Sequence, residues 1–186
     1  PGCDEFTHRQ AEIFIGAAEK LREATGYTFL RHICNSAAII RFPLYHFEMV
    51  RPGIGIYGAG NELIGGLRPA GRFMTRISQV KTIPAGEPVG YSCADVSDTL
   101  RIIAILPVGY ADGLNRRLGN RNGDLLIKGR RVPIIGNICM DMCMVDLTDI
   151  EAEEGDEVTV FGDKIGVAEL ASKAGTIPYE FLTGIS

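Results

Sequence analysis

The stretch GAGNELIGGLRPAG, residues 58–71, divides the sequence into two parts of different character. Five of its residues are glycine, and Pro69 adds a fixed backbone angle. Glycine and proline together mark turns and linkers, and domain boundaries fall in such segments. We therefore expect residues 1–58 and residues 73–186 to form separate domains, joined by a linker over residues 59–72.

The part before this stretch predicts helices alternating with short strands. Apolar residues recur at helical intervals after Thr7 and Gln10, which have capping-box spacing, and Gly26 is expected to end the helix. Short strands are expected at residues 29–30 and 55–57. This alternation is typical of a β/α barrel or a doubly wound sheet.

The part after the stretch predicts an all-β domain. β-branched and apolar runs lie between turn signals at residues 77–83, 100–108, 124–128, 132–144 and 157–161. That spacing indicates an antiparallel barrel or sandwich. Short closing helices are expected at residues 167–173 and 178–183. The predicted fold class is therefore α/β plus all-β.

The composition is that of a folded protein. Of 186 residues, 46% are hydrophobic and 23% are charged. Disordered chains contain fewer hydrophobic residues, so this composition excludes a disordered chain. The length falls short of a complete (β/α)8 barrel, which needs roughly 250 residues, so a barrel here would make the chain a fragment. No apolar run approaches the ~20 residues that span a bilayer. The net charge is −4, with both signs interspersed and no tryptophan, so neither nucleic acid nor a membrane is expected as a partner.

The cysteines indicate a reducing compartment. Five are scattered along the chain, and this odd number in a chain long enough to build its own core is unlike a disulfide scaffold. A cytoplasmic location is therefore expected. Only Cys139 and Cys143 lie close in sequence, and none of the three histidines is near them, so no metal site is expected.

A first polar cluster, residues 32–38, interrupts an apolar region with the sequence HICNSAA. A Ser/Asn turn after a short strand leaves backbone N–H groups and a hydroxyl free, which is a reasonable cradle for a phosphate. The alternative is a plain helix N-cap.

A second cluster, residues 49–58, places Arg51 beside a Pro-Gly turn just before an apolar segment. Enzymes with α/β folds keep ligand groups at such positions, and Gly53 allows a ligand to approach the backbone closely. The alternative is a surface arginine in a turn. The glycine spacing fits neither a P-loop nor a dinucleotide fingerprint.

A third cluster is spread over the predicted β domain, at residues 90–92, 109–113 and 139–142. A Gly-Tyr pair at a strand end presents a phenol that both donates and accepts hydrogen bonds. The alternatives are packing tyrosines and ordinary turns. In an extended stretch Cys139, Asp141 and Cys143 would share one face, and Asp141 would then need a partner or face a cleft.

Together these segments resemble the later part of alanine racemase, a family of enzymes that use pyridoxal 5′-phosphate (PLP). The matching segments, in the family's order, are residues 32–38, 49–58, 90–91, 107–113 and 133–146. The resemblance implies the terminal elements of a PLP-binding (β/α)8 barrel followed by a β domain. It also implies a head-to-tail homodimer with shared active sites, and the interconversion of L-alanine and D-alanine to supply peptidoglycan.

The resemblance assigns the cofactor-binding residues. Arg51 matches the residue that donates to the PLP pyridine nitrogen, and His32 matches the residue that orients this arginine. Ser36, through its hydroxyl, and Gly53 and Ile54, through backbone N–H groups, match phosphate-binding positions. Since arginine stays protonated, it cannot accept a proton from the ring.

The resemblance likewise assigns the catalytic and substrate-binding residues. Tyr91 matches the base that takes or returns the α-proton on the L-alanine face. Met140 and Asp141 match the residues that meet the substrate, and Tyr110 and Arg116 match the lining of the entryway. In the family dimer Tyr91, Tyr110 and Met140 would complete the partner's site.

One essential residue of the family has no match here. Racemisation by this route needs two bases, and the second is the lysine that forms the Schiff base with PLP. None of the five lysines has that motif around it; they are Lys20, Lys81, Lys128, Lys164 and Lys173. The 186 residues alone are therefore expected to be inactive. The alternatives are a serine or broad-specificity racemase, a related decarboxylase, and a non-catalytic β module that binds a partner.

Overall fold

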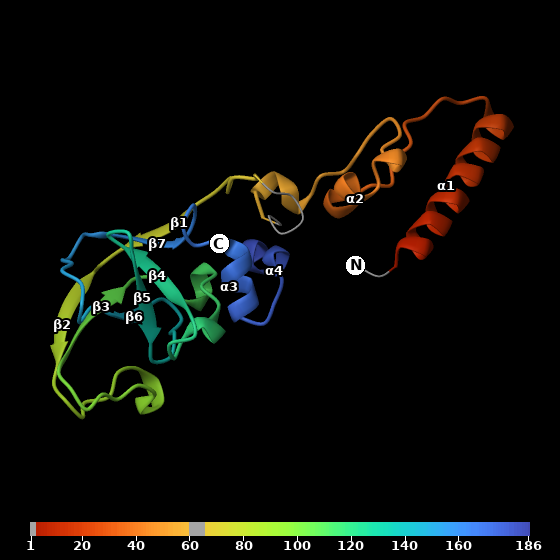
Figure 1. Cartoon of the computed structure of the whole chain (residues 1–186). Coiled ribbons are helices and arrows are strands. Elements are labelled where there is room, and N and C mark those ends of the chain that lie inside the picture. Colours follow the sequence, from red (N-terminus) through yellow and green to blue (C-terminus); the bar gives the residue numbers. More distant parts are fainter. Residues whose placement is uncertain (1–2, 60–65) are drawn as a thin grey trace. The chain divides into compact units, whose positions relative to one another are not determined.

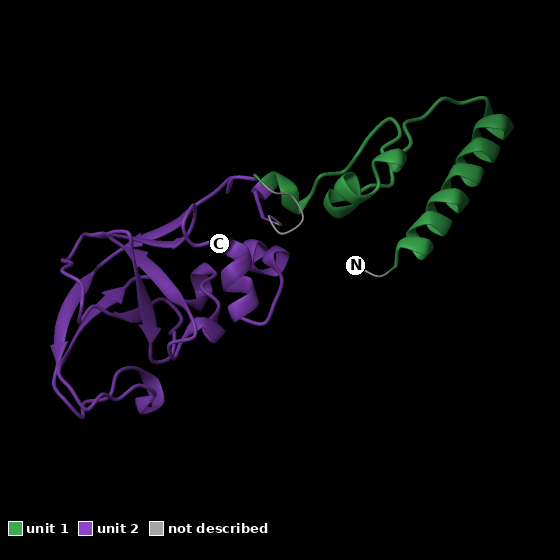
Figure 2. Ribbon diagram, in the orientation of Figure 1, with its two compact units in different colours: residues 1–56, 61–66 green, residues 57–60, 67–186 purple. Residues whose placement is uncertain are grey.

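The computed structural model describes residues 3–59 and 66–186, which form two compact units (Figure 2). Unit 1 comprises Pro1–Ile56 and Asn61–Gly66, and unit 2 comprises Tyr57–Gly60 and Leu67–Ser186. The middle of the predicted linker, residues 60–65, lies outside the described residues.

Unit 1 is built on one long helix. Its helices are α1 (Asp4–Thr25) and α2 (Ser36–Arg41), with 3-10 turns at Pro43–Tyr45 and Ile54–Tyr57 (Figure 1). Gly26 ends α1 with a left-handed φ of 67°, as predicted. The predicted start at Thr7 is wrong, because α1 begins at Asp4 and the Thr7 hydroxyl donates to the Cys3 carbonyl (3.1 Å). Two acidic residues in the first turn favour this earlier start, since they complement the helix dipole.

The strands predicted in unit 1 do not form. Residues 29–30 have no regular structure and residues 55–57 belong to a 3-10 turn, so both predictions were wrong. Two segments do run in parallel, since the Met49 N–H donates to the Arg31 carbonyl (3.3 Å) and the Arg51 N–H to the Cys34 carbonyl (2.9 Å). A parallel strand needs neighbours that cover its edges and faces, and the described residues of unit 1 supply only this one pairing.

Unit 2 contains a seven-stranded antiparallel sheet in the order β1-β7-β4-β5-β6-β3-β2 (Figure 1). Its strands are β1 (Phe73–Arg76), β2 (Gln79–Ile83), β3 (Arg101–Leu106), β4 (Asp124–Ile127), β5 (Arg130–Ile135), β6 (Cys143–Asp146) and β7 (Glu157–Phe161). The helices α3 (Val167–Lys173) and α4 (Pro178–Thr183) close the chain where they were predicted. The prediction of an antiparallel β domain is confirmed.

The apolar run at residues 132–144 is broken into two strands. Residues 139–142 bend between β5 and β6, so the expected extended stretch with Cys139 and Asp141 on one face is wrong. The cause is local pairing: the Tyr110 N–H donates to the Cys139 carbonyl (3.0 Å) and the Ala111 N–H donates to the Met140 carbonyl (2.9 Å). Those carbonyls are therefore not available to a strand partner.

The sheet encloses the core of unit 2. Fully buried side chains include Leu106, Leu125, Ile127, Val132, Ile134, Leu147 and Leu170. A second cluster, formed by Val89, Ile103, Ile135 and Met144, lies where β3, β5 and β6 meet the loop after β2. No helix in the described residues is long and apolar enough to cross a membrane.

Candidate active site

A hollow of about 740 Å³ in unit 2 gathers five of the residues singled out in the sequence. They are Tyr91, Tyr110, Arg116, Met140 and Asp141, and the rest of the lining is Gly90, Ile138, Cys139, Met142 and Met144. These residues come from three segments that are far apart in the sequence. The fold therefore brings these three segments together around one hollow.

Tyr91 presents its phenol to solvent at the edge of the hollow. It begins a 3-10 turn, Tyr91–Cys93, and is 72% exposed. Its hydroxyl has no hydrogen-bond partner in the described part of the chain, while its backbone carbonyl accepts from Asn137 Nδ2 (3.0 Å). The backbone is thus fixed and the phenol is free to contact a ligand.

The bend at Met140 is shaped by a close backbone approach from the Tyr110 turn. A Cβ on Gly109 would lie closer than 3.0 Å to the carbonyl oxygens of Cys139 and Met140, so only glycine fits there. Asp112 closes this turn by accepting from the Gly109 N–H (2.8 Å). The Met140 carbonyl is consequently occupied, whereas its N–H has no partner among the described residues and could donate to a carboxylate.

Two charged side chains of the hollow are free to meet a ligand. Arg116 and Asp141 are exposed, and neither forms an ion pair within residues 3–59 and 66–186. Among the described residues, Asp141 is therefore an unpaired acidic residue in the lining of the hollow. Opposite charges at one opening suit a zwitterion such as an amino acid.

The second group of predicted residues lies in unit 1. Ser36 is 6% exposed, and its Oγ accepts from the N–H groups of Gly53 (2.8 Å) and Gly55 (3.2 Å). The Gly53 N–H is therefore engaged by Ser36, while the Ile54 N–H has no partner in the described chain. A hydroxyl that accepts two hydrogen bonds still has its own hydrogen to donate, which suits an anion.

Arg51 and His32 belong to unit 1 as well. Arg51 pairs with Asn35 through a parallel backbone bridge, and its Nη2 contacts the Ile33 carbonyl at 3.5 Å. His32 Nδ1 is buried without a partner, and no hydrogen bond joins His32 to Arg51 in the described residues. Asn35 caps α2 by accepting from the Ala38 N–H (3.0 Å), so the N-cap interpretation holds for this residue.

Two titratable groups on the neighbouring strand β6 have shifted pKa values. Burial, with a smaller contribution from Cys139, raises the pKa of the Cys143 thiol to about 12. Burial alone would raise the pKa of Asp146, but hydrogen bonds from Thr148 and Arg121 reverse this and lower it. Among the described residues, no cluster of three His, Cys, Asp or Glu side chains could hold a metal ion.

Sequence reasoning missed Asn137, which shapes the hollow without lining it. Gly109 and Asp112 lie in the third predicted cluster, with a turn as the alternative, but their contacts with Met140 and with each other were not predicted. Asn137 follows a glycine and precedes the Ile-Cys-Met segment, and nothing in that pattern signals its bond to the Tyr91 carbonyl.

Two family models match nearly the whole chain, one in each part. A family model described as "Alanine racemase, C-terminal domain" matches residues 70–186, and one described as "Alanine racemase, N-terminal domain" matches residues 1–61. "Alanine racemase 1" of Caldanaerobacter subterraneus is 42% identical over 98% of this chain and 49% of its own length. "Alanine racemase" of Methanococcus maripaludis is 45% identical over 97% of this chain and 51% of its own length.

Solved structures of alanine racemases also match this chain. An alanine racemase of Clostridium difficile, in complex with cycloserine, superposes with a TM-score of 0.89 at 35% identity, covering 98% of this chain and 50% of its own. The alanine racemase of Bartonella henselae, with covalently bound pyridoxal phosphate, superposes with a TM-score of 0.82 at 31% identity, over 97% of this chain and 50% of its own. The fold is the predicted one, terminal elements of a β/α barrel followed by an antiparallel β domain. The chain spans about half the length of the relatives it matches.

Proposed function

The chain belongs to the alanine racemase family, and from that premise we propose that it forms part of a PLP-dependent isomerase that interconverts L-alanine and D-alanine. Its product would be D-alanine for peptidoglycan, made in the cytoplasm. The observation that carries the proposal is the hollow, because it gathers an unpartnered phenol, a free backbone N–H, an exposed arginine and an exposed aspartate in the domain that matches the family. A serine or broad-specificity racemase is the nearest alternative.

The residues of unit 1 fit the cofactor. Ser36 keeps a hydroxyl hydrogen to donate, and the Ile54 N–H has no partner in the described chain, so both suit a phosphate group. Gly53 would support the cradle through its bond to Ser36. Arg51 would donate to the pyridine nitrogen. The role of His32 in orienting Arg51 rests on the family resemblance, since no hydrogen bond joins the two side chains in the described residues. PLP, when bound, supplies an electron sink for the pair of electrons left as the α-proton departs.

Tyr91 would be the base on the L-alanine face. Its phenol would take the α-proton from L-alanine or return a proton to the same face. The Met140 N–H would hold the substrate carboxylate beside Asp141, while Tyr110 and Arg116 would guide entry. Because Arg51 would donate a hydrogen bond to the ring nitrogen without giving up its proton, the ring would stay unprotonated. An unprotonated ring is a weaker electron sink, which favours proton exchange over other PLP reactions.

The complete site would be shared between two copies of the protein. Racemisation needs a base on each face of the α-carbon, and none of the five lysines in this chain has the family motif. In a head-to-tail homodimer Tyr91, Tyr110 and Met140 of one protomer would complete the partner's site. We propose residues 1–58 as the end of the PLP-binding barrel, 59–72 as a linker and 73–186 as the β domain.

The missing lysine gives a direct test of this division. We expect the 186 residues, purified alone and supplied with PLP, to produce no D-alanine from L-alanine. Chiral chromatography of the reaction would check this. D-alanine formed by such a sample would refute the proposed dependence on a lysine elsewhere.

The role of Tyr91 is tested by Tyr91→Phe in the complete racemase chain loaded with PLP. Removing the phenol should abolish racemisation while the PLP absorbance band persists, because only the base on one face is lost. The matched control is Tyr179→Phe, which alters an exposed tyrosine of unit 2 outside the hollow and should racemise normally. Exchange of the α-proton with deuterated solvent, followed for both enantiomers, is the measurement. Unchanged exchange in Tyr91→Phe would withdraw the site assignments in unit 2.

A further inference from the structure

The loop that carries Tyr91 is tied to the sheet by a buried ion pair, and we propose that Asp95 and Arg101 are positioning residues for the Tyr91 phenol. Neither residue lines the hollow. The inference rests on the proposed role of Tyr91 as a base and adds which residues hold the Tyr91 phenol in position.

The loop from Val89 to Asp95 is a closed and strained piece of backbone. The Val89 N–H donates to the Asp95 carbonyl (2.8 Å), and the two residues form an antiparallel bridge. Between them, Ser92 and Cys93 have φ values of 63° and 50°, which side chains with a Cβ adopt only when the surroundings enforce them. The shape of the Tyr91 turn therefore depends on what holds the two ends of the loop.

The first end is held by the core. Val89 is 5% exposed and packs with Ile103, Ile135 and Met144. Gly136 approaches so closely that a Cβ there would lie 2.8 Å from the Val89 carbonyl oxygen. This end cannot move without disturbing β3, β5 and β6.

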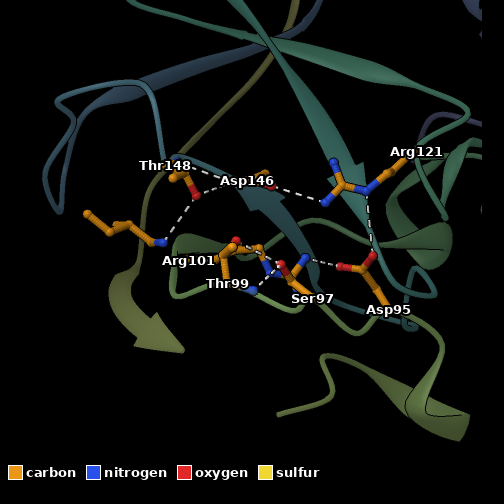
Figure 3. A network of polar contacts seen from close by, with 8 residues as sticks. Asp95, Ser97, Thr99, Arg101, Arg121, Asp146 and Thr148 are labelled. Atoms are coloured by element: carbon orange, nitrogen blue, oxygen red, sulfur yellow. Dashed lines mark hydrogen bonds and ion pairs between the residues drawn. The ribbon is translucent and has the colours of Figure 1, made fainter. Parts of the chain in front are cut away.

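The Asp95 end of the loop is held by ion pairs with two arginines. Asp95 Oδ2 accepts from Arg101 Nη1, and Asp95 Oδ1 lies 3.5 Å from Arg121 Nε (Figure 3). The side chains of Asp95 and Arg101 are only 13% and 4% exposed. Arg121 continues the chain of contacts to Asp146 Oδ2 (3.1 Å), and Asp146 Oδ1 accepts from the Thr148 hydroxyl (2.6 Å).

This network fixes the loop to two strands, because Arg101 begins β3 and Asp146 ends β6. Asp95 is also the only carboxylate paired with Arg101 in the described chain, and Arg101 Nη2 is buried without a partner. Removing the Asp95 charge would leave a buried guanidinium uncompensated. Both partners would then shift, and Tyr91, four residues before Asp95, would shift with them.

The test uses the complete racemase chain with PLP and the variant Asp95→Asn. Because the enantiomers have equal free energy, kcat/KM must fall together in both directions, and we expect about a tenfold loss or more from a misplaced base. The decisive readout is the primary isotope effect with α-deuterated L-alanine and α-deuterated D-alanine. A misplaced Tyr91 slows only the proton transfer on the L face, so the effect for L-alanine should rise relative to that for D-alanine.

The matched control is Asp163→Asn. Asp163 also pairs with an arginine, Arg72, but that pair is more than half exposed and lies outside the hollow. This variant should keep the wild-type rate and isotope effects. A loss of rate in Asp95→Asn with both isotope effects unchanged would reduce the pair to a structural role and overturn the proposal.

A second variant decides the case in which Asp95→Asn does not fold. Arg121 is 47% exposed and contacts the same Asp95 carboxylate, so Arg121→Gln should fold and should shift the isotope effects in the same direction, more weakly. Arg121→Lys keeps the charge and should restore them. Isotope effects that are unchanged in Arg121→Gln would overturn the proposal, whereas a wild-type chain that does not racemise would instead overturn the proposed function.

Discussion

Gly109 shows how one residue controls the geometry of the hollow. A side chain at this position would collide with the Cys139 and Met140 carbonyls, which the Tyr110 turn contacts directly. We expect Gly109→Ala to lower the free energy of unfolding by about 1–3 kcal/mol, the usual cost of overpacking. It should also displace Met140 and so weaken substrate binding in the complete enzyme.

Urea unfolding checks this expectation against Gly166→Ala. No atom would lie within 4 Å of a Cβ on Gly166, and its φ of −76° suits any residue. Equal stability of the two variants would contradict the steric account of Gly109.

The cysteines offer a second prediction for single residues. Burial raises the pKa of Cys143 to about 12, and only the thiolate reacts readily with alkylating reagents. At about pH 8, iodoacetamide should therefore modify the exposed Cys3 and Cys93 and spare Cys143 in the folded protein. Mass spectrometry of peptides gives the extent of labelling at each site, and unfolding in urea should remove the difference. Rapid labelling of Cys143 in the folded chain would contradict its buried environment.

Residues proposed to contact a ligand were easier to single out than residues proposed to position others. Tyr91, Met140 and Asp141 stand in short polar segments that interrupt apolar runs, and the resemblance then assigned their roles. Asp95 and Arg101 stand in no motif, and their pairing depends on a loop that folds back on the sheet. Such pairings are set by tertiary structure, which local patterns do not encode.

At the scale of elements, prediction succeeded where local pattern and tertiary pairing agree. The strand β7 and the helices α3 and α4 have the predicted bounds because each is a short apolar run between turn signals. Between β4 and β5, Lys128 and Gly129 both have positive φ, which gives the tight turn that antiparallel neighbours need. Residues 139–142 were misread because their carbonyls bind the distant Tyr110 turn.

One ion pair that connects elements makes stability depend on pH. Glu169 in α3 accepts from Arg131 Nη2 in β5 (2.8 Å), and this hydrogen bond holds the pKa of Glu169 below its usual value of 4.5. The unfolded chain therefore binds the proton first as the pH falls. The stabilisation is present above pH 4.5 and is lost as the pH falls through the lower pKa of the folded state.

In Glu169→Gln, the free energy of unfolding should consequently fall less steeply between about pH 5 and pH 3 than in the wild type. The free energy of unfolding in urea, measured across that range, is the test. Glu87→Gln, at an exposed residue whose side chain makes no ion pair in the described chain, is the control. A Glu169→Gln variant with the same slope as wild type would rule out this contribution.

At the scale of the whole molecule, the two units differ sharply in what they bury. In the described part of unit 1 only Ala11, Ala18, Cys34 and Ser36 are buried, while large apolar side chains such as Ile13, Leu30 and Leu44 are more than 60% exposed. Unit 2 contains the rest of the core. Barrel strands need neighbours to cover them, which explains why the predicted strands of unit 1 are missing although the alternating pattern is present.

Limited proteolysis of the 186-residue chain should reveal this contrast. We expect cleavage first within residues 3–56, leaving a resistant product that contains residues 67–186, because local opening is easiest where few apolar groups are buried. N-terminal sequencing and intact mass of the product identify the cut. Equal resistance of both units would mean that another surface covers the exposed side chains of unit 1, as a second copy of the chain would.

The uneven burial also has a calorimetric consequence. The heat capacity change of unfolding reflects the apolar surface that becomes hydrated, at about 12–15 cal/mol/K per residue of a well-packed protein. A chain of this length would give roughly 2.2–2.8 kcal/mol/K if both units were packed alike. Since unit 2 alone has a continuous core among the described residues, we expect a heat capacity change of about 1.5–1.9 kcal/mol/K. The melting transition should then report the unfolding of unit 2, which is about two thirds of the chain.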